Sequence, residues 1–167
     1  QAIQEGRDRV KAMALIHQNL YQDTNLIGVE AKEYITKLAS NLIANYKTNT
    51  KKIAIKTDID QIKLDVDTMI PLGLIINELI SNALKYAFEN KESGAIEITL
   101  KDAENLLHLS LKDNGKGLPK DFSVERSESL GFRLIKAFSE KLKANLTINS
   151  SENGTHVSMD IINYKTV

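Results

Sequence analysis

Four segments of the chain carry apolar residues at helical spacing. Hydrophobic side chains that recur every three or four residues lie along one face of a helix, so this spacing predicts helices. The predicted helices are residues 7–21, 29–46, 67–88 and 130–143. In the third, the residue types predict an N-terminal cap at Asp67 or Thr68 and place Pro71 in the first turn.

Between these helices, apolar and polar residues alternate as they do in strands. The predicted strands are 51–57, 96–100, 107–111, 146–148 and 156–162, with a further strand or edge at 62–66 and a turn at 102–105. Residues 114–129 are polar and contain two glycines and a proline, which predicts a loop of a length that is often functional. This order favours an α+β fold in which helices cover one face of a mixed sheet. The helix at 7–21 has no obvious partner in that layer, so we expect it to project as an arm.

Composition narrows the possible functions. The chain has 167 residues, 42% of them hydrophobic, with 22 Lys and Arg against 22 Asp and Glu. A net charge of zero argues against a dedicated nucleic-acid binder, so we expect no nucleic-acid partner. Cysteine is absent, which excludes disulfides, thiolate metal sites and a cysteine nucleophile.

The longest apolar stretch, residues 69–76, is too short to cross a bilayer, and no signal peptide precedes the first helix. We therefore expect a cytoplasmic fragment without membrane contact. Because the chain starts at Gln1, we also expect it to be a piece of a longer protein, which can itself be membrane-anchored.

The helix at 67–88 carries two polar residues one turn apart, Glu78 and Asn82. Side chains four residues apart are neighbours on a helix, and their oxygens can hold Mg²⁺ directly or through its waters. Lys85 lies one turn further on, where a cation can meet phosphate. The alternative is an ordinary solvated polar face of an amphipathic helix.

Two glycine-containing segments follow. The strand at 107–111 runs into Asp113-Asn114-Gly115-Lys116-Gly117, where the glycines allow a tight turn close to a ligand and the carboxylate can accept from an exocyclic amine. Asn-Gly is equally a strong signal for a simple turn. Gly131 begins the fourth helix, where free N–H groups suit phosphate.

Together, in this order and spacing, the three segments resemble the N box and the two glycine boxes of the GHKL ATPase superfamily, which includes type II topoisomerases, mismatch-repair ATPases and histidine kinases. The N-box resemblance spans residues 71–88. Residues 9–21 resemble the second dimerisation helix of a histidine kinase subgroup related to the HWE kinases. The HWE kinases proper carry His at the position of Asn77, so this chain is similar to a relative of theirs.

The resemblance implies a two-layer α/β sandwich of the Bergerat type, preceded by a projecting dimerisation helix. It implies two parts: residues 1–24, the end of a dimerisation and phosphotransfer region, and residues 25–167, an ATP-binding catalytic domain. It implies ATP and Mg²⁺ as cofactors, a response regulator receiver domain as partner, and a homodimer formed through the helical region of the full-length protein.

At the phosphate end, the resemblance makes Asn82 the Mg²⁺ ligand and Glu78 a general base or the partner of a metal-bound water. It places Lys85 on phosphate, Gly131 at the helix start facing the phosphates, and residues 116–129 in a lid over ATP.

At the adenine end, the resemblance makes Asp113 the acceptor for the adenine amino group. Thr155 supports Asp113 and a water at the base, and Tyr86 packs on the nucleotide. The other positions implied to shape the pocket follow Asp113 in the loop: Gly115, Gly117 and Leu118.

The implied reaction moves the γ-phosphate of ATP to a histidine on a neighbouring helix, for relay to the response regulator. Three features depart from the family pattern. The subgroup's acceptor histidine lies on a helix before the start of this chain, the second glycine box has a single Gly131, and the short lid has Phe122 as its sole aromatic residue. Two alternatives remain open: a GHKL serine kinase or hydrolysing ATPase, and a degenerate adaptor that only dimerises and docks a regulator.

The three histidines do not supply the missing acceptor. His17 lies on the helix at 7–21, but it aligns with a packing position of that helix, so we assign it to structural contact. His108 alternates with apolar neighbours and is expected to point outward, and His156 follows a Gly-Thr turn. The histidines and acids show neither zinc-site spacing nor a Ser-His-Asp arrangement.

Overall fold

A five-stranded sheet backed by helices forms the body of the protein. The computed structural model describes residues 28–46, 52–89, 91–119, 122 and 129–167. The predicted helix at 7–21, with His17, lies outside these residues, as does most of the predicted lid at 116–129.

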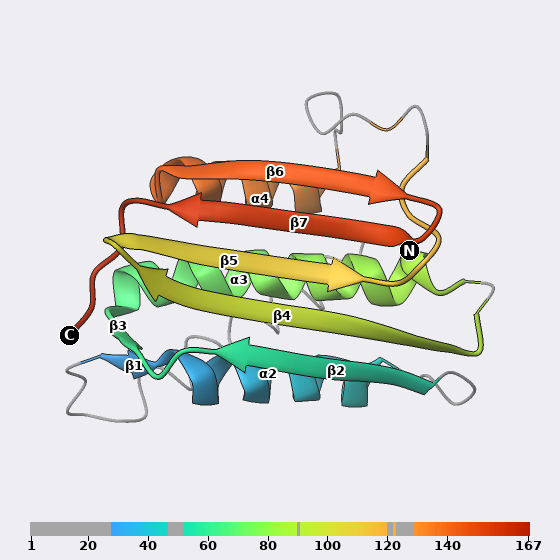
Figure 1. The fold of residues 1–167 in the computed structure, drawn as a ribbon, viewed down its shortest axis with the longest axis horizontal. Helices are drawn as coiled ribbons and strands as arrows, with labels where there is room; N and C mark the ends of the chain where they lie inside the picture. Colours follow the sequence, from blue (N-terminus) through green and yellow to red (C-terminus); the bar gives the residue numbers. More distant parts are fainter. Residues whose placement is uncertain (1–27, 47–51, 90, 120–121, 123–128) are drawn as a thin grey trace.

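The described strands are β1 (Val29–Glu30), β2 (Lys52–Ile59), β3 (Lys63–Leu64), β4 (Ser93–Ala103), β5 (Leu106–Asp113), β6 (Ala144–Ser151) and β7 (Gly154–Ile161). The main sheet has the order β2-β4-β5-β7-β6, in which β2 and β4 are parallel and every other neighbouring pair is antiparallel. The helices are α2 (Ala31–Asn45), α3 (Val66–Asn82) and α4 (Leu130–Lys141), and a π-helix, η1 (Ala83–Ala87), continues α3. All lie on one face of the sheet (Figure 1). The predicted α+β fold is confirmed.

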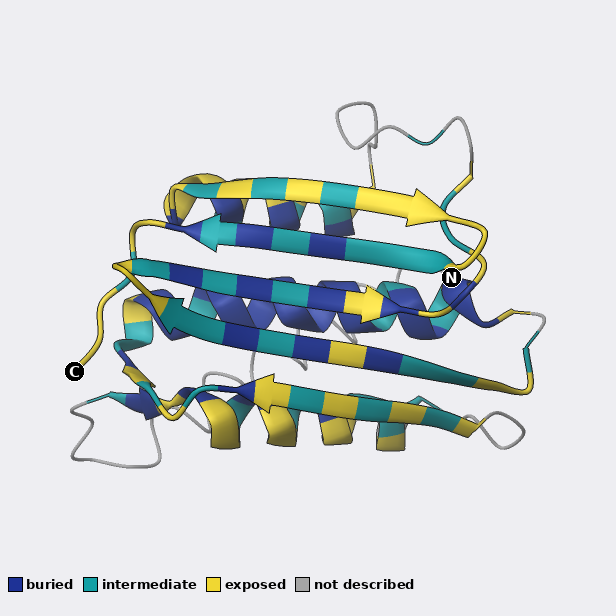
Figure 2. Ribbon diagram, viewed as in Figure 1, coloured by how far each residue is buried: buried dark blue, intermediate teal, exposed yellow. Residues whose placement is uncertain are grey.

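The core lies between the sheet and the helices. Strand residues alternate between a buried, apolar side that faces the helices and an exposed or half-buried side, which gives the stripes in Figure 2. Ile96, Ile98 and Leu100 of β4 meet Ile76 and Ile80 of α3 in this core, all at most 1% exposed. Burying a side chain of this size contributes about 1.5–3 kcal/mol, so this layer fixes α3 across the middle of the sheet.

The hairpin of β4 and β5 confirms the predicted strand pair, with longer strands than the sequence indicated. Glu104 and Asn105 form its two-residue turn with φ of 53° and 64°. Positive φ at both central residues matches the twist of the flanking strands. The strands therefore extend to the turn, and β5 ends at Asp113.

The start of α3 differs from the prediction. Asp65 is the cap, and its side chain accepts a hydrogen bond from Thr68 N at 2.9 Å, so the predicted caps Asp67 and Thr68 are wrong. Because α3 begins at Val66, Pro71 lies in the second turn instead of the first. Its missing N–H leaves the carbonyl of Asp67 without an intrahelical donor, a small cost where the residue is exposed to water.

The strand predicted at 62–66 is only two residues long. β3 pairs with β1 in a separate ribbon, in the register Val29 to Leu64, and does not join the main sheet. The C-terminus closes over this ribbon, because Val167 N donates to Lys63 O at 3.1 Å. The ribbon thus anchors the N-terminal end of α2 and the end of the chain to the start of α3.

Candidate functional site

A cavity of about 610 Å³ opens where α3 passes into η1, beside the end of β5. Its walls come from α3, η1, β5, the loop after β5, α4, β6 and β7. The lining residues are Leu79, Asn82, Ala83, Lys85, Tyr86, Ala87, Leu111, Asp113, Lys116, Gly117, Leu118, Pro119, Phe122, Ser129, Leu130, Phe132, Ile148, Thr155 and Val157. Segments far apart in the sequence therefore meet in one site.

Most of the residues that the sequence singled out line this cavity. They are Asn82, Lys85, Tyr86, Asp113, Gly117, Leu118 and Thr155. Glu78, Gly115 and Gly131 do not line it and lie behind its walls, where all three are buried. The roles in nucleotide binding that were predicted for all ten residues remain predictions.

Glu78 and Asn82 differ in their surroundings although they are one helical turn apart. Glu78 is 3% exposed, which rules out the simple solvated polar face for this position. Asn82 is half-buried and lines the cavity. Beside Glu78, the buried Oδ1 of Asn77 has no hydrogen-bond partner among the described residues. The helix therefore carries a buried polar layer under the cavity. Burying polar groups lowers the stability of the fold unless they form hydrogen bonds.

The π-helix η1 sets the orientation of the next polar residues. A π-helix bonds each N–H one residue further back than an α-helix does, and single π turns are frequent at functional sites. Lys85 and Tyr86 lie on η1 and line the cavity, and Tyr86 is 57% exposed. Lys85 therefore places a cation in the same cavity as Asn82.

Asp113 is the buried acid of the site, at 5% exposure. Its Oδ1 accepts hydrogen bonds from Gly115 N at 2.8 Å and from Thr155 N at 3.3 Å. Burial raises the pKa of Asp113, and these two backbone donors, the nearby charge of Lys91 and the Thr155 side chain all lower it. The carboxylate thus has a fixed orientation and retains acceptor capacity for a ligand.

The loop after Asp113 is packed so closely that two of its glycines cannot be replaced. A Cβ on Gly115 would lie 2.4 Å from Ala87 Cβ and 2.7 Å from Asp113 Oδ1. Gly117 has φ of +74°, and a Cβ there would meet Ser151 O at 2.0 Å. Leu118 N donates to Ser150 Oγ at 2.7 Å, which fixes the loop to β6. These glycines allow close approach of the loop to protein atoms of η1, β5 and β6, and the predicted approach to a ligand stays a prediction.

At the opposite wall, α4 begins at the cavity. Ser129 caps the helix by accepting from Phe132 N at 3.4 Å, and Gly131 is buried just inside the first turn. The rings of Phe122 and Phe132 contact each other with centroids 5.0 Å apart. This wall is apolar, and it suits a flat, hydrophobic group.

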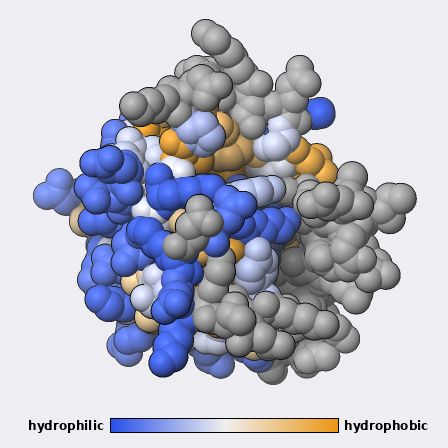
Figure 3. All heavy atoms as spheres, turned by 90° about the vertical axis from the view of Figure 1, so that its right-hand side faces the viewer, coloured by the Kyte–Doolittle hydropathy of each residue, from blue (hydrophilic) through white to orange (hydrophobic). Residues whose placement is uncertain are grey.

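Sequence reasoning missed the apolar part of the lining. Leu111, Ile148, Val157 and Phe132 line the cavity, yet each reads in the sequence as an ordinary core position. Figure 3 looks onto this end of the sheet, where hydrophobic surface gathers near the top between hydrophilic surface and the residues drawn in grey. Leu130, at 50% exposure, is an exposed apolar residue at the start of α4. A mixed apolar and polar cavity is typical of small-molecule sites.

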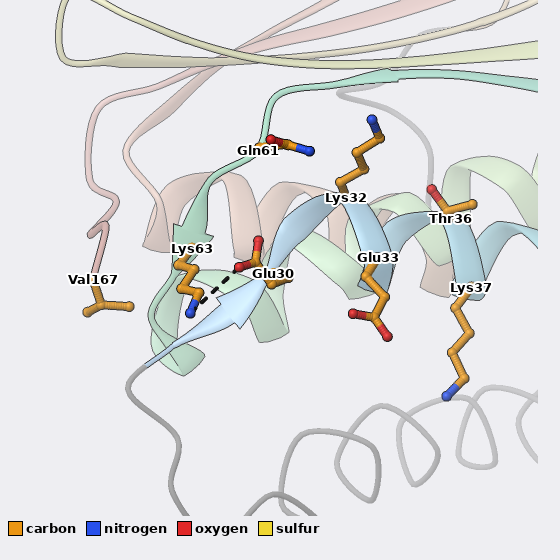
Figure 4. A pocket seen from close by; sticks show the side chains of 8 residues that line it. All are labelled: Glu30, Lys32, Glu33, Thr36, Lys37, Gln61, Lys63 and Val167. Carbon is orange, nitrogen blue, oxygen red and sulfur yellow. Dashed lines mark ion pairs between the residues drawn. The ribbon is translucent and has the colours of Figure 1, made fainter.

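A second hollow, of about 870 Å³, lies beside α2, β1 and β3 (Figure 4). Its side chains carry both signs of charge, including an ion pair between Lys63 Nζ and Glu30 Oε1 at 3.6 Å. Both partners are about half exposed, so this pair contributes little. Compared with the cavity at Asp113, this hollow lacks a buried polar group to select a ligand.

Among the residues that the structure describes, no group of three or more His, Cys, Asp or Glu side chains could hold a metal ion. Within the same residues, no helix has the length and hydrophobicity needed to span a membrane.

Comparison with known proteins identifies relatives of the whole chain. Residues 67–164 match the family described as histidine kinase-, DNA gyrase B-, and HSP90-like ATPase, and residues 1–46 match a histidine kinase family. The chain is 27% identical over 163 residues to blue-light-activated histidine kinase 2 of Erythrobacter litoralis, covering 92% of this chain and 45% of that protein. It is 29% identical over 164 residues to the sensor histidine kinase PdtaS of Mycobacterium tuberculosis, covering 96% of this chain and 32% of that protein.

The fold agrees with a solved structure. The histidine kinase domain of the Erythrobacter litoralis blue-light-activated histidine kinase EL346 superposes with a TM-score of 0.83 at 24% identity, covering 96% of this chain and 83% of that one. At this identity the likeness shows a shared fold. The chain spans less than half of the length of the two relatives named above, at 45% and 32%.

Proposed function

This chain belongs to the family of histidine kinase-, DNA gyrase B-, and HSP90-like ATPases, and we therefore propose that its cavity binds Mg-ATP as the catalytic domain of a sensor histidine kinase. In the intact protein it transfers the γ-phosphate to a histidine outside these residues. The observation that carries the proposal is the placement of a buried carboxylate, Asp113, and a helix amide, Asn82, on two walls of one cavity.

The adenine end lies at Asp113. Its carboxylate accepts from the amino group of the base, in an orientation held by Gly115 and Thr155. The apolar lining described above takes the faces of the ring, and Tyr86 packs beside it. Apolar side chains that cover the faces of the base exclude water from the hydrogen bond at its edge. That hydrogen bond is stronger in the resulting low-dielectric surroundings.

The phosphate end lies at Asn82 and Lys85. The residues present fit Mg²⁺. In proteins this ion usually has one or two ligands from side chains, and water and phosphate oxygens complete its coordination, so it does not need a dedicated cage of acids. Asn82 supplies such an oxygen in the cavity, which Lys85 also lines. Held there, Mg²⁺ would supply positive charge against the charge that develops on the transferred phosphoryl group. Lys85 adds a second positive charge, and Asn82 fixes where the phosphates lie.

Glu78 is best assigned to the layer beneath Asn82. Its 3% exposure and its place outside the cavity lining argue against direct contact with an incoming histidine. We propose that it orients Asn82 and a water at the metal, so that of its two predicted roles the water partner is favoured over the general base. Residues that orient a metal ligand are commonly worth a factor of about 10–100 in affinity or activity.

The relatives support a proposal for the partners. PdtaS is a sensor histidine kinase, and residues 1–46 match a histidine kinase family. We propose that the full-length protein is a homodimer through its helical region and passes phosphate to the receiver domain of a response regulator.

The test is a calorimetric titration with a non-hydrolysable ATP analogue, with Mg²⁺ and with EDTA. We expect micromolar-to-millimolar binding in Mg²⁺. Asn82→Ala should weaken it about 10- to 100-fold in Mg²⁺ and much less in EDTA, because only the metal contact is lost. Asn145→Ala, an exposed amide on β6, is the matched control and should bind like the wild type.

Unchanged binding by Asn82→Ala in Mg²⁺ would remove the metal role. A folded wild-type protein that binds no nucleotide would favour the non-catalytic adaptor. For the reaction itself, the intact protein should acquire phosphate that is stable in alkali and labile in acid, as expected of phosphohistidine; an acid-stable product would indicate a serine kinase.

A further inference from the structure

The turn between η1 and β4 carries a lysine that neither the sequence pattern nor the cavity lining singles out. Lys91 is half-buried, and its backbone N–H donates to Phe88 O at 3.1 Å, which closes the turn. Its ammonium donates to two main-chain oxygens of the glycine loop, Asn114 O at 2.5 Å and Gly115 O at 3.0 Å. One side chain therefore connects two segments that are more than twenty residues apart, at the end of the sheet where β5 finishes (Figure 1).

The geometry of the peptide bond gives these contacts a consequence for Asp113. In a trans peptide, the C=O of one residue and the N–H of the next point in opposite directions. With Asn114 O on Lys91, the N–H of Gly115 points away from Lys91, and it donates to Asp113 Oδ1 at 2.8 Å. The ammonium thus sets the orientation of a donor that holds the adenine acceptor.

The next peptide repeats the arrangement. Gly115 O is bound by Lys91, and the N–H of Lys116 donates to Ala87 O on η1 at 2.9 Å. Asn114 is held separately by β4, where Ala95 N donates to Asn114 Oδ1 at 2.8 Å. Two successive peptide planes therefore have both of their polar ends fixed, and Lys91 supplies the donor to both carbonyls.

We propose that Lys91 is a positioning residue of the nucleotide site, whose ammonium orients the two peptides after Asp113 and so presents the carboxylate to the base. The inference rests on the nucleotide site proposed above. Lys91 does not line the cavity, so it acts on the ligand only through the loop.

The positive charge of Lys91 has a second effect, on the pKa of Asp113, which can be measured separately. Burial raises the pKa of Asp113, and the charge of Lys91 opposes this, so Lys91 helps to keep the acceptor ionised. Among the described residues, Lys85 and Tyr86 on η1 and Lys116 in the loop also line the cavity with Asp113. The side-chain charge that lowers the pKa of Asp113 is that of Lys91. Removing Lys91 therefore makes nucleotide binding more sensitive to acid.

The experiment measures the Kd of Mg-ADP by calorimetry at about pH 8 and about pH 6. Lys91→Met loses the hydrogen bonds and the charge, and we expect its Kd to rise about five- to tenfold at the higher pH, as for loss of charge-assisted hydrogen bonds, and further at the lower pH. Lys91→Arg keeps both and should stay within about threefold of the wild type at both pH values. Lys101→Met, at the far end of β4 where the lysine pairs with Asp58 and Asp60, is the matched control and should not change the Kd.

The titration of the Asp113 carboxyl, followed by NMR without nucleotide, is independent of binding. In Lys91→Met its midpoint should move to higher pH, and the Gly115 amide should lose its protection from hydrogen exchange. If Lys91→Met does not fold, Lys91→Gln, which keeps a donor without charge, carries both measurements.

The inference is overturned if Lys91→Met, or Lys91→Gln in its place, has the wild-type Kd and an unmoved Asp113 titration. It is also overturned if Lys91→Arg and Lys91→Met lose affinity for Mg-ADP equally. If the wild type binds no Mg-ADP, the proposed function fails, and the NMR titration still decides the role of Lys91.

Discussion

Asp113→Asn separates the role of the buried acid in stability from its role in binding. Asparagine has the same shape, so its Oδ1 can still accept the N–H groups of Gly115 and Thr155, which lie 2.8 and 3.3 Å from that oxygen in the wild type. Its Nδ2 then takes the place of the second carboxylate oxygen. The variant therefore presents a donor where the wild type presents an acceptor.

The loss in binding follows from that exchange. A hydrogen bond to a charged group contributes about 1.5–3 kcal/mol, so its loss raises the Kd for an adenine nucleotide by about 10- to 100-fold. The amide donor facing the amino group of adenine adds a further penalty, because both are donors. Hypoxanthine has an oxygen at the same position, so the variant should lose much of the wild-type preference for ADP over IDP.

Stability should move in the opposite direction. The folded protein raises the pKa of Asp113 above its ordinary value of 3.8, chiefly by burial, so the ionised side chain lowers the stability of the fold at neutral pH. That cost is relieved as the pH falls through the raised pKa toward 3.8, where the folded state binds a proton that the unfolded state does not. Asp113→Asn removes the charge, so its unfolding free energy near neutral pH should equal or exceed that of the wild type.

Two assays decide the matter: calorimetry with Mg-ADP and Mg-IDP, and urea unfolding at several pH values. Asn145→Ala, at an exposed amide on β6 outside the cavity, is the control in both assays. Affinity for ADP within about threefold of the wild type in Asp113→Asn would refute the adenine assignment. A loss of more than about 1 kcal/mol in unfolding free energy would refute the argument that the buried charge is costly.

Other positions offer independent tests of the packing. A Cβ on Gly73 would lie 2.5 Å from Tyr34 Oη. Gly73→Ala should therefore lower the unfolding free energy measured in urea by about 1–3 kcal/mol, and by less when Tyr34 is replaced by Phe. An equal loss in both backgrounds would show that the tyrosine hydroxyl is not the obstacle. Tyr164 donates to Asp102 Oδ1 at 2.6 Å, and this bond raises the pKa of Tyr164 from 10.0 to about 12, so the stability it adds is complete below pH 10 and lost as the pH rises through about 12. Tyr164→Phe should therefore show a flatter loss of stability in alkali than the wild type, and identical alkaline curves would exclude a contribution from this bond.

The sequence was sufficient to predict the order of the main helices and of the strands of the main sheet, because each has a strong local signal, but residues 29–30, predicted as helix, form β1. Helical spacing located α2, α3 and α4, and alternation located the strands of the main sheet. Errors occurred where several local solutions compete. The run Asp65-Val66-Asp67-Thr68 offers three capping residues, and only the packing of the chain selects Asp65.

The cavity was predictable only in its polar part. Asn82 and Asp113 stood out because amides and acids are unusual at such positions, whereas Ile148 and Val157 are indistinguishable from other core residues until β6 and β7 are placed beside Asp113. The π-helix had no signal at all, since an α turn and a π turn can have the same residues and differ by one hydrogen-bond step. Lys91 was missed for a similar reason: its contacts are with main-chain oxygens, which any residue supplies.

The two ends of the proposed nucleotide site share one junction, and this has a consequence for binding. Ala87 ends the π-helix that carries Lys85, and its carbonyl accepts from Lys116 N in the loop that holds Asp113. The side chain of Ala87 occupies the space that a Cβ on Gly115 would need, so a larger residue does not fit at position 115. A shift of η1 that moves Lys85 therefore also displaces the peptides that orient Asp113. Phosphate contacts and base contacts should accordingly depend on each other. In binding measurements, a substitution at Ala87 should raise the Kd of adenosine through the base contact and the Kd of ADP through both contacts, and an unchanged Kd for adenosine would refute the coupling.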